Sequence, residues 1–324
     1  MKTFDVLSVG LAVCDIIAKP IRKGALSADS SRIDTLKTAS GGDALNAAVN
    51  MAKLGLKVCL IGKVGRDMFG DYLVNEASRW GVNTDMIARD EEAATSASIV
   101  LVEENGERHF LYYGKANDSL SIRDIPDEAI RSAKIVHVGS AMALAGLDGY
   151  GTAELFKKAK VSGAMTSLDV TWDSDGKWLG KIEEALYFTD IFVPSLQEAQ
   201  RISGKTEPDG MAAFFQSYGV KVFAVKLGGD GCFVTDGKEA FTIPPFHVAE
   251  VADTTGAGDA FMAGFLAGTV RGFPLRERGV LGNAVAANCV MAVGATGGTK
   301  NWVETMEFIQ YNKLLEKAGG NTCR

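Results

Sequence analysis

The residues best suited to chemistry lie in one short segment, residues 253–259 with the sequence DTTGAGD, at the start of a run with helical character. Small residues at a helix start let backbone N–H groups approach an anion closely, and the helix dipole favours negative charge there. Because Asp259 falls in the first turn, we expect the helix end to keep its carboxylate ionised at neutral pH and able to accept a proton. An anion site beside a base is what phosphoryl transfer requires of a protein.

The same segment also has a simpler structural explanation. Asp253 or Thr254 could cap the helix, while the two glycines could serve only close packing. For an isolated Gly-Ala-Gly-Asp segment this explanation is the better one. The rest of the chain must therefore decide between a catalytic and a structural role.

The chain around this segment alternates between strand and helix patterns. Short apolar runs predict strands, and apolar residues at helical spacing predict the helices between them. We expect strands near residues 4–10, 57–64, 135–139, 166–170, 190–194 and 221–227, a strand pair within 232–243, and helices over 43–54, 67–80, 258–272, 276–293 and 302–317. Repeated strand-then-helix units predict a mostly parallel sheet covered by helices on both faces, in a single α/β domain over residues 1–324.

One region departs from this alternation. The β-rich runs ASIVLVEE (97–104) and ERHFLYY (107–113) flank Asn105-Gly106, which is a strong hairpin signal. An antiparallel hairpin does not fit the crossover pattern of a parallel sheet. We therefore expect a small β lid, formed by residues near 17–37 and 94–116.

Composition excludes several classes of protein. With 47% apolar residues in 324, the chain can bury a large core and does not resemble a disordered protein. Its net charge is −6, whereas binding of nucleic acid usually requires a basic face, so we expect no nucleic-acid partner. The sequence shows neither a signal peptide nor a run of ~18 apolar residues, so we expect no membrane partner and a cytoplasmic location. Its five widely spaced cysteines predict reduced core thiols.

Two distant segments resemble the signatures of the PfkB (ribokinase-like) carbohydrate kinases. Residues 253–265 resemble the C-terminal signature, and residues 40–48, SGGDALNAA, resemble the N-terminal Gly-Gly signature. The strand and helix pattern is similar over nearly the whole chain. The resemblance implies a ribokinase-like three-layer α/β/α fold with a small β-sheet lid. It also implies an ATP-dependent sugar kinase that transfers the γ-phosphate to a hydroxyl of a small carbohydrate such as ribose or 2-keto-3-deoxygluconate.

The resemblance further implies a role for each matching position. Asp259 would be the catalytic base, beside an anion hole formed by Gly256, Ala257 and Gly258. The residues implied in sugar binding are Asp15, Gly41, Gly42 and Asn46. The residues implied in nucleotide binding, most of them in the loop KLGGDG at 226–231, are Lys226, Gly228, Gly231 and Asn283.

Metal binding is implied at two places. Glu198 matches the Glu of a family Asn-x-x-Glu motif that organises Mg²⁺ through water, although Ser195 replaces the Asn and dipole matching alone also selects Glu in a first turn. Asp253 and the backbone near Thr255, with a loop such as residues 293–298, match positions that hold a monovalent cation, which would make the enzyme potassium-dependent. A helix-cap role explains Asp253 equally well.

The lid hairpin carries a cluster of aromatic residues, Phe110, Tyr112 and Tyr113. Exposed apolar strands tend to be covered, and members of the resembled family often pair through their lids, so we expect a homodimer. His109, on the same hairpin, faces either substrate or solvent. Two other functions stay open: a nucleoside kinase of the same fold, and a non-catalytic sugar-binding protein, which should lack an intact base and anion hole.

Overall fold

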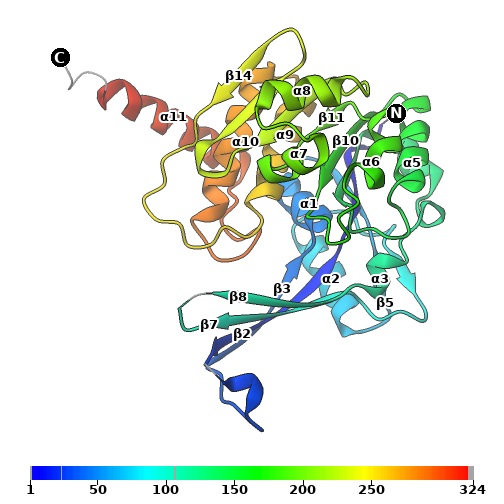
Figure 1. Ribbon diagram of the computed structural model, residues 1–324, viewed down its shortest axis with the longest axis vertical. Helices are drawn as coiled ribbons and strands as arrows, with labels where there is room; N and C mark the ends of the chain where they lie inside the picture. Colours follow the sequence, from blue (N-terminus) through cyan, green and yellow to red (C-terminus); the bar gives the residue numbers. More distant parts are fainter. Residues whose placement is uncertain (1, 23, 106, 320–324) are drawn as a thin grey trace.

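Strands and helices alternate along most of the computed structural model, which describes residues 2–22, 24–105 and 107–319 (Figure 1). One large sheet has the spatial order β14 (Ala240–Ile243), β13 (Cys232–Thr235), β12 (Val222–Lys226), β11 (Ile191–Phe192), β10 (Met165–Val170), β9 (Ala133–Ala141), β1 (Phe4–Gly10) and β4 (Val58–Ile61). The strands from β12 to β4 are parallel, and β13 and β14 extend the sheet antiparallel at one edge. The predicted mostly parallel sheet is confirmed.

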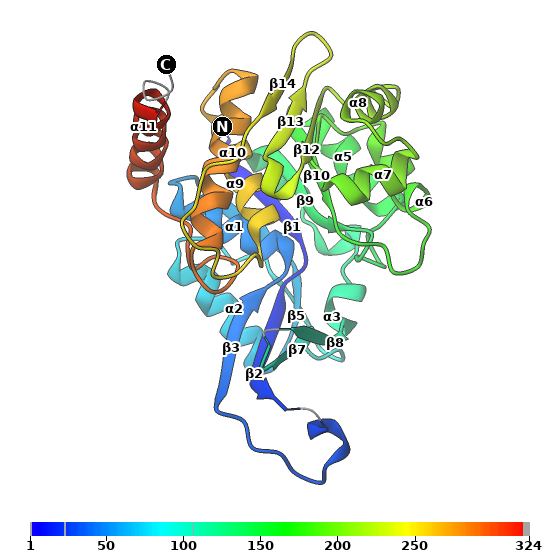
Figure 2. The same cartoon turned by 60° about the vertical axis from the view of Figure 1, so that its left-hand side comes forward.

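Helices cover both faces of this sheet, which gives three layers (Figure 2). The core on one face contains residues of α1 (Asp43–Lys53), α2 (Met68–Arg79), α9 (Ala257–Val270), α10 (Leu275–Val290) and α11 (Trp302–Gly319). The core on the other face contains residues of α4 (Asp127–Ser132), α5 (Tyr150–Val161), α6 (Leu179–Leu186), α7 (Leu196–Ser203) and α8 (Pro208–Gln216). Along β1, Val6 enters the first core and Leu7 the second, as the two-residue period of a strand requires.

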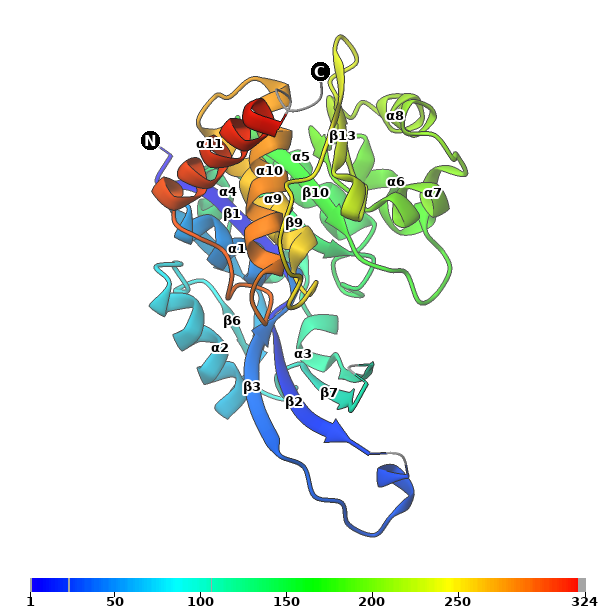
Figure 3. The ribbon, with the colours of Figure 1, turned by 90° about the vertical axis from the view of Figure 1, so that its left-hand side faces the viewer.

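A second, smaller sheet projects from the body of the molecule (Figure 3). Its spatial order is β3 (Thr35–Gly41), β2 (Val13–Ile21), β7 (Ala97–Glu103) and β8 (Arg108–Tyr113). β7 and β8 form the antiparallel hairpin that the sequence predicts, and the Gly106 of its expected turn lies outside the described residues. Since β2 follows β1 almost directly, this sheet begins at the carboxyl end of β1, the strand next to the edge strand β4 of the large sheet.

The single strand expected over residues 57–64 is wrong. β4 ends at Ile61, and β5 (Lys63–Gly65) pairs instead with β6 (Ala88–Asp90) in a separate two-stranded sheet. A Cβ at Gly62 would lie 3.1 Å from the carbonyl oxygen of Gly10, so the chain passes close to the end of β1 here. This contact and the charged Lys63 that follows divide the apolar run.

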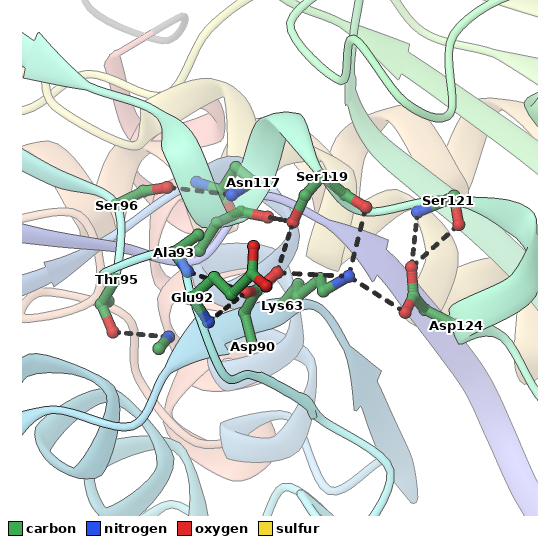
Figure 4. Close-up of polar contacts among 12 residues, drawn as sticks. Lys63, Asp90, Glu92, Ala93, Thr95, Ser96, Asn117, Ser119, Ser121 and Asp124 are labelled. Atoms are coloured by element: carbon green, nitrogen blue, oxygen red, sulfur yellow. Dashed lines mark hydrogen bonds and ion pairs between the residues drawn. The ribbon is translucent and has the colours of Figure 1, made fainter.

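Polar contacts anchor the base of the small sheet (Figure 4). The Lys63 ammonium lies 3.4 Å from Asp90 and 3.2 Å from Asp124, at the end of the short helix η2 (Ile122–Asp124). The backbone N–H of Asn117, in α3 (Lys115–Asp118), donates to the Ser96 hydroxyl at 3.0 Å. The side chain of Asn117 also bonds both backbone groups of Ala12, so Asn117 links the segment after β8 to the β1–β2 connection and to the segment before β7.

Four of the five cysteines, Cys14, Cys59, Cys232 and Cys289, are buried free thiols, and Cys323 lies outside the described residues. Burial raises the pKa of these thiols to about 11 or 12, which makes them unreactive. Across the described part of the chain, no helix has both the length and the apolar character that crossing a bilayer requires.

Candidate active site

The tip of helix α9 is built for close approach of an anion. Its N-cap, Gly256, has a φ of 75°, and a Cβ there would lie 2.4 Å from the Cβ of Ala295. Only glycine fits this conformation and this contact. A Cβ on Gly258 would lie 3.3 Å from the Lys226 ammonium, so this backbone faces a positive charge. We call residues 256–258 the anion-hole segment.

A cavity of about 380 Å³ opens at this tip. Its lining includes the anion-hole segment and the ionisable residues Asp43, Asp169, Glu198, Lys226 and Asp259. Asp259 is 8% exposed and faces this cavity, so it is not sealed in the core. The base and the anion site predicted from the sequence thus share one cavity.

Asn46 connects this cavity to the Gly-Gly segment. Its side-chain amide donates a hydrogen bond of 2.9 Å to Asp259, and it lies in the first turn of α1, whose N-cap is Gly42. Gly42 has a φ of 92°, and a Cβ there would lie 2.5 Å from the Leu11 carbonyl oxygen. The two signature segments therefore meet through a direct side-chain contact.

The pKa of Asp259 is raised well above its ordinary value, which is opposite to our expectation. Burial is the main cause, and the negative charge of Asp43 adds to it, while the hydrogen bond from Asn46 and the charge of Lys226 oppose it. The helix end alone would favour the anion, but the loss of hydration outweighs it. A base with a raised pKa is better matched to proton transfer near neutral pH.

Lys226 carries the positive charge of the cavity. Its ammonium lies 2.9 and 2.8 Å from the two carboxylate oxygens of Asp169, and both side chains are largely buried. Burial lowers the pKa of Lys226, but Asp169 and Glu198 more than compensate, so the pKa is raised and the ammonium persists. For Asp169, burial disfavours the charged form and raises the pKa to about 7.

A second cavity, of about 530 Å³, adjoins the first, and both share Gly228, Thr254 and Ala257. Much of its lining is apolar and includes Phe246, Val248, Val251, Ala286 and Val290. Asn283 also lines it and donates hydrogen bonds to the carbonyls of Ile243 and Pro244. Gly231 lines neither cavity, and a Cβ there would lie 2.1 Å from the Ile243 carbonyl oxygen, so chain packing explains this glycine.

Asp15 and Gly41 meet at the base of the small sheet. A Cβ on Gly41 would lie 2.5 Å from Oδ2 of Asp15, so the carboxylate lies directly over this glycine. Burial raises the pKa of Asp15 to about 6. Neither residue lines the cavity of Asp259, but Gly41 ends β3 and α1, whose Asp43 lines that cavity, begins two residues later.

Glu198 and Ser195 cap helix α7 reciprocally. The Ser195 N–H donates to Oε2 of Glu198 at 2.8 Å, and the Glu198 N–H donates to the Ser195 hydroxyl at 3.4 Å. Ser195 thus replaces the Asn of the resembled motif with another good N-cap residue. The capping role leaves Glu198 in the cavity lining.

Asp43 was expected only to begin a helix, but it also lines the site. Its carboxyl lines the same cavity as Asp259, and its pKa is raised by burial and by Glu198, against the lowering effect of Lys226. The signal was present, because Asp43 follows two glycines at a helix tip, as Asp259 follows the anion-hole segment.

The contacts of Asp253 do not fit a bound monovalent cation. Oδ1 accepts hydrogen bonds from the Thr255 N–H at 2.9 Å and from the guanidinium of Arg108 at 3.0 Å, and Oδ2 accepts from the Gly294 N–H at 3.0 Å. Arg108 also bonds the Thr255 hydroxyl. Nitrogen donors therefore take up both carboxylate oxygens.

His109 follows Arg108 in β8, so strand alternation places it on the opposite face of the small sheet. It contacts Glu103 at 3.0 Å. With Glu103 and Glu107 it makes the one His/Cys/Asp/Glu group in the described residues whose ligand atoms all lie within 4.8 Å of one another. The carboxylates of the α9 cavity form no such ready-made metal cage.

The fold and this site define a class, the small-molecule kinases with a ribokinase-like fold. The model of the pfkB family carbohydrate kinases matches residues 3–302, so the chain belongs to this family. It is an ATP-dependent carbohydrate kinase, a phosphotransferase that acts on a hydroxyl group.

Relatives agree with this assignment. The chain is 33% identical over 256 residues to an uncharacterized sugar kinase of Archaeoglobus fulgidus, covering 79% of this chain and 100% of the relative. It is 25% identical to a 2-dehydro-3-deoxygluconokinase of Bacillus subtilis, covering 89% and 92%. The crystal structure of a ribokinase-II-type protein from E. coli, in complex with ATP and Mg²⁺, superposes with a TM-score of 0.82 at 25% identity, covering 95% and 99%.

Proposed function

We propose that this kinase phosphorylates a neutral monosaccharide, with Asp259 as its catalytic base. The observation that supports this most is the Asn46–Asp259 hydrogen bond, which joins the Gly-Gly helix to the anion-hole segment at one cavity. Asp259 takes the proton of the acceptor hydroxyl, whose oxygen attacks the γ-phosphorus of ATP as ADP leaves. The N–H groups of the anion-hole segment and Lys226 balance the charge that develops on the phosphoryl oxygens.

The two adjoining cavities suit the two parts of ATP. The triphosphate belongs in the cavity of Lys226 and Gly228, and adenine belongs in the apolar cavity beside Asn283. Mg²⁺ commonly binds through one or two carboxylates, substrate phosphates and water. Asp43 and Glu198 would hold it in this way, and the ion would neutralise the phosphates.

The charges of the acceptor side favour a neutral sugar over a sugar acid. Asp15 lies over Gly41 at the base of the small sheet, and Asp43 and Asp259 line the α9 cavity, so the proposed acceptor side carries three carboxylates. A substrate carboxylate would require a cation there, but Arg108 is committed to Asp253. Hydroxyl groups can donate to Asp15, and the glycine backbone leaves room for a sugar ring.

We propose that the small sheet, within residues near 17–37 and 94–116, acts as a lid on a single α/β domain and also pairs two copies of the chain. Ile16, Ile99, Leu111 and Tyr113 share its face away from Arg108 and line a mainly apolar groove of about 540 Å³ with Met68 and Phe69. Leu111 is 59% exposed there. Burying such a face supports a homodimer, and light scattering at micromolar concentration should give twice the monomer mass.

The four free thiols support a reducing, cytoplasmic location.

The substrate is tested by measuring ADP release with ribose, fructose, 2-keto-3-deoxygluconate and adenosine, each with MgATP. We expect a neutral sugar to give the highest kcat/KM. A preference for 2-keto-3-deoxygluconate would contradict the charge argument, and a preference for adenosine would identify a nucleoside kinase. Thermal shifts of the Asp259→Asn variant with the same compounds report binding separately from turnover.

A further inference from the structure

Arg108 reaches from the lid hairpin to the loop that precedes the anion-hole segment. Its guanidinium bonds Oδ1 of Asp253 at 3.0 Å and the hydroxyl of Thr255 at 2.5 Å, across 145 and 147 residues of sequence. The Asp253 side chain is 5% exposed and that of Arg108 is 35% exposed. A charged hydrogen bond to a buried carboxylate is stronger than a surface ion pair and more costly to break.

Asp253 is the centre of this loop. Besides Arg108, it accepts the N–H of Thr255, next to Gly256, and the N–H of Gly294. Gly294 belongs to residues 293–298, which also contain Ala295, the residue packed against Gly256. The orientation of the anion-hole segment therefore depends on Asp253 remaining ionised and fully bonded.

Two backbone carbonyl groups within residues 293–298 also accept hydrogen bonds from nitrogen donors. The Ala295 carbonyl accepts from the side-chain amide of Asn50 at 3.3 Å, and the Thr296 carbonyl accepts from the Lys53 ammonium at 2.5 Å. A cation held here would have to displace these donors. Two positive side chains already neutralise negative groups at this place: Arg108 bonds the Asp253 carboxylate, and Lys53 bonds the Thr296 carbonyl.

We infer that Arg108 supplies the fixed positive charge that a monovalent cation would otherwise supply to Asp253, so that closure of the lid, not potassium, completes the anion hole. Arg108 is thus a positioning residue that acts through Asp253. The inference depends on the proposed role of the anion-hole segment. It makes two linked claims: turnover is independent of potassium, and removal of the guanidinium creates a requirement for an added cation.

The test compares the wild type with Arg108→Met in KCl, in choline chloride and in dilute guanidinium chloride at equal ionic strength. For the wild type, we expect kcat to differ less than about twofold between potassium and choline. For Arg108→Met, we expect kcat in choline to fall about 10- to 100-fold, within the range for weakened transition-state electrostatics. Potassium or guanidinium should restore part of this loss, and Arg108→Lys should keep most of the activity.

Arg22→Met is the matched control, because Arg22 also belongs to the lid region but forms an exposed ion pair with Glu104. It should behave as the wild type in all three salts.

A second measurement does not depend on turnover. Potassium should raise the Tm of Arg108→Met relative to choline, and it should not raise the Tm of the wild type. The inference is wrong if potassium activates the wild type tenfold or more. It is also wrong if neither ion restores Arg108→Met, or if that variant has normal kcat. Normal turnover of Asp259→Asn would instead contradict the proposed function, in which Asp259 is the base.

Discussion

The side-chain amide of Asn46 donates a hydrogen bond of 2.9 Å to the carboxylate of Asp259, although the two residues lie 213 positions apart. Asn46 is 4% exposed, so water competes little for this bond. The bond favours the ionised form of Asp259, while burial and Asp43 favour the protonated form. Two residues of α1, Asn46 and Asp43, therefore shift the pKa of Asp259 in opposite directions, in addition to the larger effect of burial.

Replacing Asp43 should change the pH dependence of the reaction. The base acts only when ionised, so activity is lost as the pH falls through the pKa of Asp259. Asp43→Asn removes a negative charge that raises this pKa, so the acidic limb of the kcat/KM profile should move to lower pH. Asp127→Asn, on the surface of α4, is the control and should leave the limb in place. An unchanged or upward-shifted limb would rule out this coupling.

Gly41→Ala should weaken sugar binding without unfolding the protein. The new Cβ would lie 2.5 Å from the end of the Asp15 side chain, which can rotate away, so the cost falls on the position of the carboxylate. We expect the KM for the sugar to rise by about tenfold, equivalent to ~1.4 kcal/mol, with a smaller change in kcat. Gly180→Ala controls for the substitution, because a Cβ at Gly180 meets nothing within 4 Å. Equal KM values in the two variants would contradict this placement of Asp15.

Asp15→Asn should stabilise the protein at neutral pH while impairing sugar binding. The folded-state pKa of Asp15, about 6, lies above the value of ~3.9 expected in the unfolded chain. The native state then binds the proton more tightly, so ionisation costs stability as the pH rises between these values, and this cost persists at pH 7. Urea unfolding should give a gain on the order of 1 kcal/mol at pH 7 and little gain at pH 4. The same gain at both pH values would show that the carboxylate charge is not the cause.

The sequence predicted most of what depends on local pattern. The large sheet, the helices, the hairpin and the tip of α9 follow from periodicity and from glycine-rich helix starts, which are short-range signals. Asp43 was missed because its importance depends on α1 and α9 packing side by side on one face of the sheet. The predicted direction of the Asp259 pKa shift was wrong. The effect of the helix end is local and can be predicted from the sequence, whereas the effect of burial depends on the whole fold.

Two other features lay beyond local reasoning. The contact of Arg108 with Asp253 joins a strand to a loop 145 residues later, and no spacing rule connects them. The division of residues 57–64 into β4 and β5 depends on the close approach of Gly62 to Gly10. Both are tertiary contacts without a pattern of their own in the sequence.

The most direct measurement of the central claim is the turnover of Asp259→Asn, compared with its binding of sugar and MgATP by calorimetry. If Asp259 is the base at the anion hole, kcat should fall by about 10²- to 10⁴-fold while both dissociation constants stay within severalfold of the wild type. A variant that binds both ligands and turns over at a near-normal rate would contradict the account.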